Sequence, residues 1–342
     1  MEKCKNISVV IPAYNATDSI LRCIDSINRG TLKPYEIIVV DDASTDDTKQ
    51  VVENTFSSDK QVRVIKNPSN RGPAHARNKG VSVANGNYIL FVDSDTEANN
   101  KLLEHYNRHC DAYDAIVGIY NEVPINDTAC AWYKSLFYYF MLGKPDGAVE
   151  YDQFSASCAG IKKDIFERLG GYDEWFKPGC DLENEELGYR ITKAGYSMVL
   201  MPDMQVQHEF PNFPRMAKTF FIRTALWVEM FCVRRQFASV GGTKGMGVAS
   251  LSLLVSAPLF IFGLFNIYFC FGALFFFAIF LKSYVPFYIF VLDKKPSQIF
   301  NMFFLSIIFT NIVALGSLWG LAKVVFRKSA IYQKFATNTT HI

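Results

Sequence analysis

The chain has 342 residues, of which 50% are hydrophobic, and a formal net charge of +2 with a pI near 8.0. This balanced charge gives no support for a nucleic-acid-binding surface, so we expect no nucleic acid among the partners. The length suits one large domain or two modest ones. Charged and apolar residues alternate up to about residue 210, whereas the stretch after about residue 246 is almost continuously apolar. We therefore expect an α/β domain followed by a helical membrane domain.

The first hundred residues alternate between short β-branched runs and amphipathic stretches. Buried strands are predicted over residues 7–12, 36–40, 62–65 and 88–92. Helices are predicted over 18–28, from about residue 45, and over 73–84, with Ser44, Thr45 and Asp46 capping the second. This order predicts a parallel sheet with right-handed crossovers. Ligand-binding residues are then expected at the carboxyl ends of its strands.

The pattern between residues 97 and 210 is looser. Aromatic residues crowd the segment 132–140, which suits contact with a lipid or sugar acceptor and equally suits core packing. Residues 213–237 place basic side chains beside aromatic ones, as in a helix that lies at a bilayer surface. A helix packed on the preceding domain would show a similar pattern.

Three apolar stretches near the C-terminus are long enough to cross a bilayer. They cover residues 247–265, then 267–292 as one helix that is bent near Pro286, and finally 299–321. Three crossings would place Arg327, Lys328 and Lys334 on the far side, against the positive-inside tendency. Four crossings or one re-entrant segment would remove this conflict, and the sequence leaves the number open. The expected division is 1–212 catalytic domain, 213–243 interfacial helices, 244–325 transmembrane helices and 326–342 polar tail.

The eight cysteines, at positions 4, 23, 110, 130, 158, 180, 232 and 270, show neither a CxxC pair nor zinc-site spacing. Isolated reduced thiols fit a cytosolic face. The first six residues are polar and lack the apolar core of a cleavable signal. We therefore expect an integral membrane protein whose soluble domain is cytoplasmic, in the plasma membrane if the source is prokaryotic.

The sequence contains four polar clusters. Three of them lie at the ends of predicted strands, and the remaining one spans the start of the third predicted helix. They are residues 10–15 (VIPAYN), 40–46 (VDDASTD), 70–80 (NRGPAHARNKG) and 91–95 (FVDSD). An Asp-x-Asp turn alone is a weak signal, because aspartate is common in turns. It does present two hard oxygen ligands, and Mg²⁺ or Mn²⁺ needs one or two carboxylates while phosphates and water complete its octahedron. Asp93 and Asp95 are therefore candidate metal ligands, and Arg77 could add positive charge beside a diphosphate.

In this order and spacing the four clusters resemble the family 2 glycosyltransferases, which have the GT-A fold. The resemblance covers about residues 7–210. It implies a nucleotide-sugar donor, a metal-bound diphosphate as leaving group and inversion at the anomeric carbon. Carried over residue by residue, it implies that Pro12, Tyr14 and Asp42, with Asp41 beside them, contact the nucleoside. Arg77 and Asp93 would then lie along the donor diphosphate, and Asp93 and Asp95 would hold the metal.

A fifth motif departs from the family pattern. The acidic stretch 181–190 (DLENEELGYR) places Asn184 where the resemblance would put an aspartate base. An amide does not accept a proton as a carboxylate does. Three explanations stay open: Glu183 or Glu185 serves instead, the acceptor is an already ionised phosphate, or the enzyme is impaired. Of these residues we select Glu183 as the base, against the alternative of a solvated acidic helix start.

His208 resembles the late histidine that many relatives use near the metal, although a lone histidine at a strand end is often structural. The expected function is transfer of a hexose or amino sugar to a membrane-associated acceptor, such as a polyprenyl phosphate or lipid-linked glycan of the cell envelope. A processive synthase would carry a Gln-x-x-Arg-Trp motif, which is absent. A sugar-nucleotide pyrophosphorylase would lack this motif set. The alternative outside the enzymes is a nucleotide-binding membrane scaffold, favoured only by Asn184.

Overall fold

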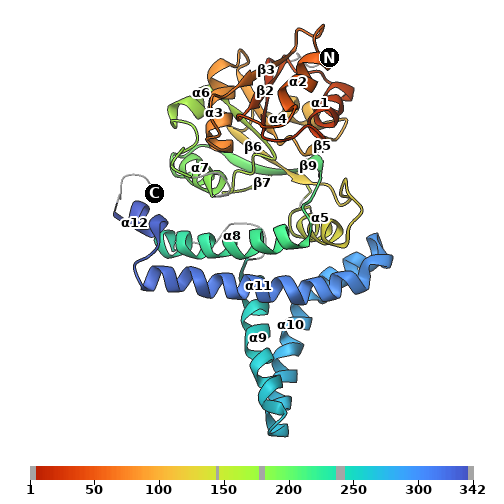
Figure 1. Cartoon of the computed structure of the whole chain (residues 1–342), viewed down its shortest axis with the longest axis vertical. Coiled ribbons are helices and arrows are strands. Elements are labelled where there is room, and N and C mark those ends of the chain that lie inside the picture. The colour runs from red at the N-terminus through yellow and green to blue at the C-terminus, as the bar shows by residue number, and fades with distance from the viewer. Residues whose placement is uncertain (1–4, 144–145, 177–181, 236–242, 338–342) are drawn as a thin grey trace. The chain divides into compact units, whose positions relative to one another are not determined.

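The computed structural model describes residues 5–143, 146–176, 182–235 and 243–337 (Figure 1). The chain divides into two compact units. The first contains residues 1–125 and 142–209, and the second contains 126–141 and 210–342. Cys4 and Cys180 lie outside the described residues, and the six cysteines within them are free thiols.

Within the described residues, nine strands of the first unit form one sheet in the order β3-β2-β1-β4-β8-β6-β9-β5, with β7 also paired to β9. The strands are Ile7–Ala13 (β1), Glu36–Asp41 (β2), Val62–Lys66 (β3), Tyr88–Val92 (β4), Thr96–Ala98 (β5), Ala115–Tyr120 (β6), Val149–Glu150 (β7), Cys158–Lys162 (β8) and Met198–His208 (β9). The first four predicted strands are confirmed, and they pair in parallel. The mixed part of the sheet begins at β8, which is antiparallel to β4 and to β6. The result is a mostly parallel, Rossmann-like GT-A domain.

Six helices of the described chain belong to this unit. They are Ile20–Arg29 (α1), Thr48–Thr55 (α2), Pro73–Val83 (α3), Leu102–His109 (α4), Lys163–Arg168 (α6) and Glu183–Lys193 (α7). Burial of β1 and β2 is nearly complete, as expected for parallel strands that are covered on both faces. Gly80 lets α3 approach β1, since a Cβ there would lie 2.3 Å from a methyl carbon of Val10. This explains a glycine of the third cluster by packing.

The second predicted helix begins later than expected. Helix α2 starts at Thr48, and neither Ser44 nor Thr45 caps it. Both residues instead bond to the ends of the first two strands, because the Ser44 amide donates to Asp41 and the Thr45 amide donates to Asn15. Asp46 does bond to the first residue of the helix, since its Oδ1 accepts from the Thr48 amide at 3.1 Å.

Every described element of the second unit is a helix or a 3₁₀ turn. Its elements are Ala129–Leu142 (α5), Phe213–Arg234 (α8), Thr243–Gly263 (α9), Ile267–Lys294 (α10), the 3₁₀ turn Pro296–Gln298, Ile299–Val325 (α11) and Ala330–Thr337 (α12). Helix α10 is continuous and includes Pro286. Helices α9, α10 and α11, the last together with its preceding turn, are long and apolar enough to cross a membrane.

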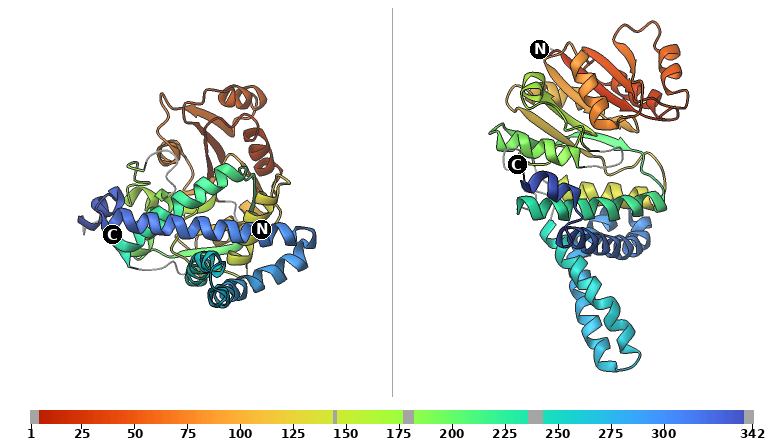
Figure 2. Two further views of the ribbon diagram at one scale, coloured as in Figure 1. Left: turned by 60° about the horizontal axis from the view of Figure 1, so that its bottom comes forward. Right: turned by 60° about the vertical axis from the view of Figure 1, so that its left-hand side comes forward.

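Helices α9 and α10 form an antiparallel hairpin that projects away from α8 and α11, as Figures 1 and 2 both show. The Ser256 hydroxyl of α9 donates to the carbonyl of Ala273 in α10 at 3.0 Å. The aromatic residues of α5 pack inside this unit, with Tyr133 stacked on Phe309 at 5.1 Å and Phe137 edge-on to Phe287 at 5.3 Å. Of the two interpretations of segment 132–140, core packing therefore accounts for Tyr133 and Phe137.

Candidate active site

The first two clusters lie at one edge of the sheet because β1 and β2 are parallel and in register. Ala13 pairs with Asp41, so the chain leaves both strands at the same level. Pro12 is inside β1, and the Tyr14 side chain beyond it is 49% exposed. An exposed aromatic ring at the carboxyl end of a central strand is positioned to meet a planar ligand.

The ends of β1 and β2 are tied together by reciprocal hydrogen bonds. The Asn15 amide donates to the Ser44 hydroxyl at 2.9 Å, and Asn15 Oδ1 accepts from the Thr45 amide at 2.9 Å. Asn15 has φ 51° and Ala43 has φ 60°, a left-handed conformation that is costly for alanine. Asp41 is fully buried and accepts from the Ser44 amide. This edge is therefore held by several mutually supporting contacts.

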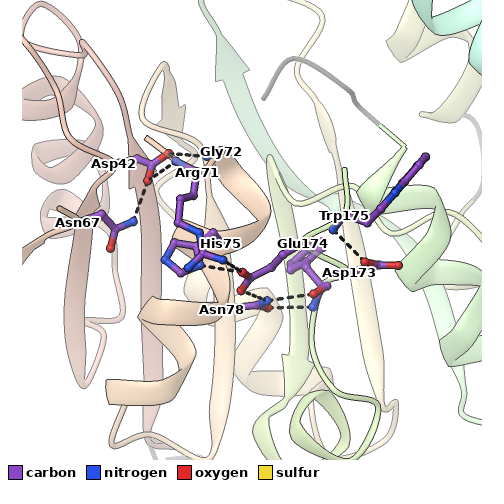
Figure 3. A network of polar contacts seen from close by, with 10 residues as sticks. Asp42, Asn67, Arg71, Gly72, His75, Asn78, Asp173, Glu174 and Trp175 are labelled. Atoms are coloured by element: carbon purple, nitrogen blue, oxygen red, sulfur yellow. Dashed lines mark hydrogen bonds and ion pairs between the residues drawn. The ribbon is translucent and has the colours of Figure 1, made fainter. Parts of the chain in front are cut away.

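Asp42 organises the loop that leads into α3 (Figure 3). Its buried carboxylate accepts from the Asn67 amide group at 2.7 Å, from the Arg71 backbone N–H at 3.0 Å and from the Gly72 N–H at 2.6 Å. A carboxylate has about four acceptor positions, so these bonds use most of its capacity. In this structure Asp42 thus shapes the third cluster directly.

Glu174 connects the same loop to the segment before α7, and sequence reasoning missed it (Figure 3). Its carboxylate lies 2.8 Å from Arg71 Nη2, 2.9 Å from His75 Nδ1 and 3.0 Å from Asn78 Nδ2. Burial acts to raise the pKa of Glu174, but these partners outweigh it and hold the pKa below its usual value. The only nearby signal is the preceding Gly170-Gly171, where Gly171 has φ +68° and packs against Asn78.

Asp95 and His208 meet because of strand register. Strand β5 is antiparallel to β9 and pairs Thr96 with His208, which places the imidazole beside the preceding residue. His208 Nε2 lies 3.5 Å from Asp95 Oδ1. The Asp95 side chain is 47% exposed and that of His208 is 12% exposed. Two candidate metal ligands that are 113 positions apart in the sequence are thus brought together.

Arg77 of α3 is buried and contacts Asp93. Its side chain is 5% exposed, and Nη2 donates to Asp93 Oδ1 at 2.9 Å while Nη1 lies 3.6 Å from Glu183 Oε1. Its guanidinium carbon is 5.5 Å from the centre of the Tyr172 ring, a cation–π distance. Burial acts to lower the pKa of Arg77, and the two carboxylates more than offset this, so the pKa is raised. The arginine predicted beside a diphosphate is therefore a buried ion-pair partner of Asp93 and Glu183.

The first turn of α7 carries the candidate base residues. Glu183 and Glu185 are 2% and 4% exposed, so this is not a solvated acidic helix start. Asn184 Oδ1 accepts from the Tyr172 hydroxyl at 3.2 Å. Glu186 is held by Arg190, whose Nη2 also donates to the Gly171 carbonyl at 2.7 Å. The helix start is thus anchored to the loop that carries Glu174.

The donor chemistry of Asp93, Asp95 and His208 fits a divalent cation. Among the described residues, no group of three or more His, Cys, Asp and Glu side chains could hold a metal by itself. Mg²⁺ and Mn²⁺ do not require one, because they accept one or two carboxylates and complete their shell with water and phosphate oxygens. Asp95 and His208, with Asp93 two positions from Asp95, would therefore be enough protein ligands if a diphosphate were also bound.

Comparison with known proteins supports the assignment of this domain. Residues 8–170 match the model of the family described as Glycosyl transferase family 2. Residues 8–170 therefore form a domain that is similar to the family 2 glycosyltransferases. The matched segment includes the four polar clusters and ends before α7, Asn184 and His208.

Curated relatives match the N-terminal part of the chain. The glycosyltransferase GlyG of Streptococcus pneumoniae is 34% identical over 138 residues, which are 40% of this chain and 44% of GlyG. A poly(ribitol-phosphate) beta-glucosyltransferase of Bacillus spizizenii is 43% identical over 105 residues, 30% of this chain and 17% of that protein. The chain thus covers less than half the length of these relatives.

Solved structures extend the similarity of fold. The mannosyltransferase PcManGT of Pyrobaculum calidifontis, solved with GDP-Man and Mn²⁺, aligns with 93% of this chain and 88% of its own at a TM-score of 0.57. The identity is 18%, so the likeness concerns the fold alone. It agrees with the mostly parallel GT-A sheet described above.

Proposed function

We propose that this protein is a metal-dependent, inverting glycosyltransferase that moves a hexose or amino sugar from a nucleotide-sugar donor to a lipid-linked, membrane-associated acceptor. The observation that carries the proposal is the half-exposed Asp95 carboxylate with His208 Nε2 at 3.5 Å, at the end of a sheet whose other polar clusters face the same edge. Relatives and solved neighbours are named for glycosyl transfer, and two neighbours hold Mn²⁺.

In this proposal each cluster has one task. Tyr14, Pro12 and the Asp41–Asp42 edge hold the nucleoside, and Asp93, Asp95 and His208 hold Mg²⁺ or Mn²⁺ together with the diphosphate. The bound cation would offset the negative charge that develops on the departing nucleoside diphosphate. Arg77 orients Asp93 through its 2.9 Å hydrogen bond. The apolar C-terminal helices keep the domain at the bilayer, where a polyprenyl-linked acceptor and a cytoplasmic donor would meet.

Proton removal from the acceptor is assigned to Glu183, the carboxylate at the start of α7. A phosphate acceptor is already ionised and would need little help from a base. Three variants separate these cases: Glu183→Gln, Glu185→Gln and Asn184→Asp. If Glu183 is the base, only the first lowers kcat by about 10²-fold. If all three variants turn over like the unchanged protein, the acceptor is an ionised phosphate and the base assignment fails.

The function is tested with the full chain in detergent against a panel of nucleotide sugars, each with Mn²⁺, Mg²⁺ or a chelator. A ligand that binds the native state raises the unfolding temperature, so the donor is the sugar nucleotide that gives a metal-dependent shift. Transfer of radiolabelled sugar to polyprenyl phosphate in membranes then measures activity. If nucleoside diphosphate binds in a metal-dependent way but neither transfer nor hydrolysis occurs, the glycosyltransferase proposal fails. The nucleotide-binding membrane scaffold that Asn184 favours would then be the better interpretation.

A further inference from the structure

The number of membrane crossings is undecided by length and composition, since three segments satisfy those criteria. The helix contacts within the second unit decide it. Helix α11 runs parallel to α8 and beside it, as both figures of the ribbon show. Phe309 stacks on Phe220 with ring centres 4.7 Å apart, and Lys323, farther along α11, forms an ion pair with Glu229 of α8.

Two glycines of α11 make this contact close. A Cβ at Gly316 would lie 2.5 Å from the carbonyl oxygen of Phe221, and one at Gly320 would lie 2.3 Å from that of Ala225. The two backbones therefore touch over more than one turn. Just beyond α11, Ser329 donates to the Glu229 carboxylate at 2.6 Å. Helices α8 and α11 form one layer, so both cross the membrane or neither does.

Helix α8 is unsuited to crossing. Its 22 residues carry five charges, namely Arg215, Lys218, Arg223, Glu229 and Arg234. A charged residue at the centre of a membrane helix costs about 2.5–3.5 kcal/mol on insertion scales, and Arg223 occupies the middle of α8. The layer must therefore lie along the membrane surface.

Helix α11 presents an apolar stripe that suits this position. Its buried face consists of residues such as Met302, Phe309, Gly316 and Gly320. The opposite face exposes Phe300, Phe304, Ile308, Leu315, Trp319 and Val325, which are between 40% and 76% accessible. These positions lie within one side of a 3.6-residue helix and continue along its whole length. An exposed apolar face of this length, joined to a membrane hairpin, matches the acyl-chain boundary of a bilayer.

The α9–α10 hairpin, unlike α8, is almost free of charged residues. Residues 245–281 contain no charged residue, and Lys244 and Lys282 bound this stretch in the sequence. The tip is apolar and exposed, with Leu264 at 83% and Phe265 at 86%. Both arms leave the α8–α11 layer in the same direction (Figures 1 and 2). The hairpin can thus enter the hydrocarbon from the layer and return to it.

We infer that α11 does not cross the membrane: it lies with α8 in the interface, with its apolar stripe against the acyl chains, while α9 and α10 alone enter the hydrocarbon as a hairpin. The residues after α11, including Arg327 and Lys328, then remain on the same side as α8. This arrangement removes the conflict with the positive-inside tendency. It does not depend on which sugar is transferred.

Reporters at the two ends of the full chain test the sidedness. A protein whose fluorescence is lost on export is fused before Met1 in one version and after Ile342 in the other, and an enzyme that is active only after export is fused in the same two places. We expect the two ends to give the same result with each reporter. Opposite results at the two ends would mean an odd number of crossings and would overturn the inference.

Nitroxide labels along α11 test the lipid contact directly. Single cysteines replace Phe300, Ile308, Leu315 and Val325 in a cysteine-free chain in vesicles, and accessibility to oxygen and to a polar quencher gives the depth of each label. An interfacial helix places all four about 5–10 Å below the surface. A crossing helix would place Leu315 about 15 Å deeper than Phe300, half of a hydrocarbon core of about 30 Å.

Labels at Leu251 and Ile261 on α9 are the matched control, since the hairpin should show a steep change of depth between them. A V-shaped profile along α11 would overturn the inference. So would labels shielded from both quenchers and broadened by neighbouring labels, because a second copy of the chain would then cover the stripe instead of lipid.

Discussion

Two charged pairs of the first unit differ in exposure. The Asp95 and His208 side chains are 47% and 12% exposed, whereas those of Arg77 and Glu183 are 5% and 3% exposed. A charge that faces water can exchange water for a ligand, whereas a buried charge must be neutralised by its protein partner. The difference suits Asp95 and His208 to ligand binding, and it suits Arg77 to holding Asp93 and Glu183 in place.

The largest expected effect comes from breaking the buried pair. Arg77→Met leaves Asp93 and Glu183 without their cation, and removal of one partner of a buried ion pair typically costs about 3–5 kcal/mol. We expect a large fall in the unfolding temperature of the full chain, measured by scanning fluorimetry. Arg108→Met, which removes an exposed pair with Glu104, should change stability by less than about 0.5 kcal/mol. Equal losses of stability in the two variants would show that the buried ion pair contributes no more to stability than the exposed one.

Substitution of Asp95, in the exposed pair with His208, should lower the activity and leave the stability unchanged. Asp95→Ala removes a partly exposed carboxylate that has no task in the core, so the unfolding temperature should stay within about 2 °C. Sugar transfer should fall by about 10²–10³-fold, and a chelator should have a similar effect on the unchanged protein. Asp25→Ala on the outer face of α1 is the control. Full activity of Asp95→Ala would remove this residue from the metal site.

A third carboxylate is buried yet satisfied by several donors. Glu36 accepts from the Ser8 hydroxyl at 2.7 Å, from the Asn85 amide at 2.5 Å and from Arg63 at 2.8 Å. Burial acts to raise the pKa of Glu36, and these donors lower it below its ordinary value of 4.5. The stabilisation is therefore present above the unfolded-state pKa and is lost as the pH falls through the folded-state pKa. Glu36→Gln should cost about 1.5–3 kcal/mol at pH 7.

The pH dependence distinguishes this effect from simple packing. Thermal unfolding at pH 7, 5 and 4 should show the gap between the unchanged chain and Glu36→Gln shrinking towards low pH. Glu53→Gln, at a surface pair with Lys49, should show neither the loss nor the pH dependence. A gap that stays constant down to pH 4 would mean that the ionised form of Glu36 contributes nothing.

The smallest effect is expected at Glu174, whose side chain is 32% exposed. Glu174→Gln weakens its contacts with Arg71 and His75, and pairs of this exposure contribute at most about 1 kcal/mol. Because the loop before α3 is positioned by these contacts, the KM for the donor should rise by up to about fivefold with kcat unchanged. Glu167→Gln, at a nearby surface pair, provides the baseline. A change in kcat alone would contradict a positioning role.

The sequence predicted the parallel half of the sheet because its signals are local. The β-branched runs at β1 to β4 and the amphipathic helices between them need only neighbouring residues to be recognised. The antiparallel half depends on pairings such as Val92 with Cys158 and Thr96 with His208, which no local pattern encodes. The start of α2 was placed too early because Ser44 and Thr45 bond across strands, a choice that is visible only in three dimensions.

The candidate site shows the same division. Motif residues Tyr14, Asp42 and Asp95 could be selected from their order alone, whereas Glu174 is one acid among many in the sequence. Burial of Arg77 was also hidden, because the Tyr172 ring beside its guanidinium comes from a distant loop and packs against Phe91 and Phe166. The layer of α8 and α11 could not be predicted either, because it depends on the contact of Gly316 and Gly320 with the backbone of α8, which is distant in the sequence.

The hydrogen bonds that join the ends of β1 and β2 have a consequence for ligand binding. Asn15 and Ala43 already hold left-handed backbone angles, and the bonds among Asn15, Ser44 and Thr45 fix them in the free protein. Folding has thus already met the conformational cost of this edge. A ligand that docks there orders little additional chain, so more of its contact energy appears as affinity. Tyr14 follows directly from this edge, and its ring is presented by a backbone that is set in advance.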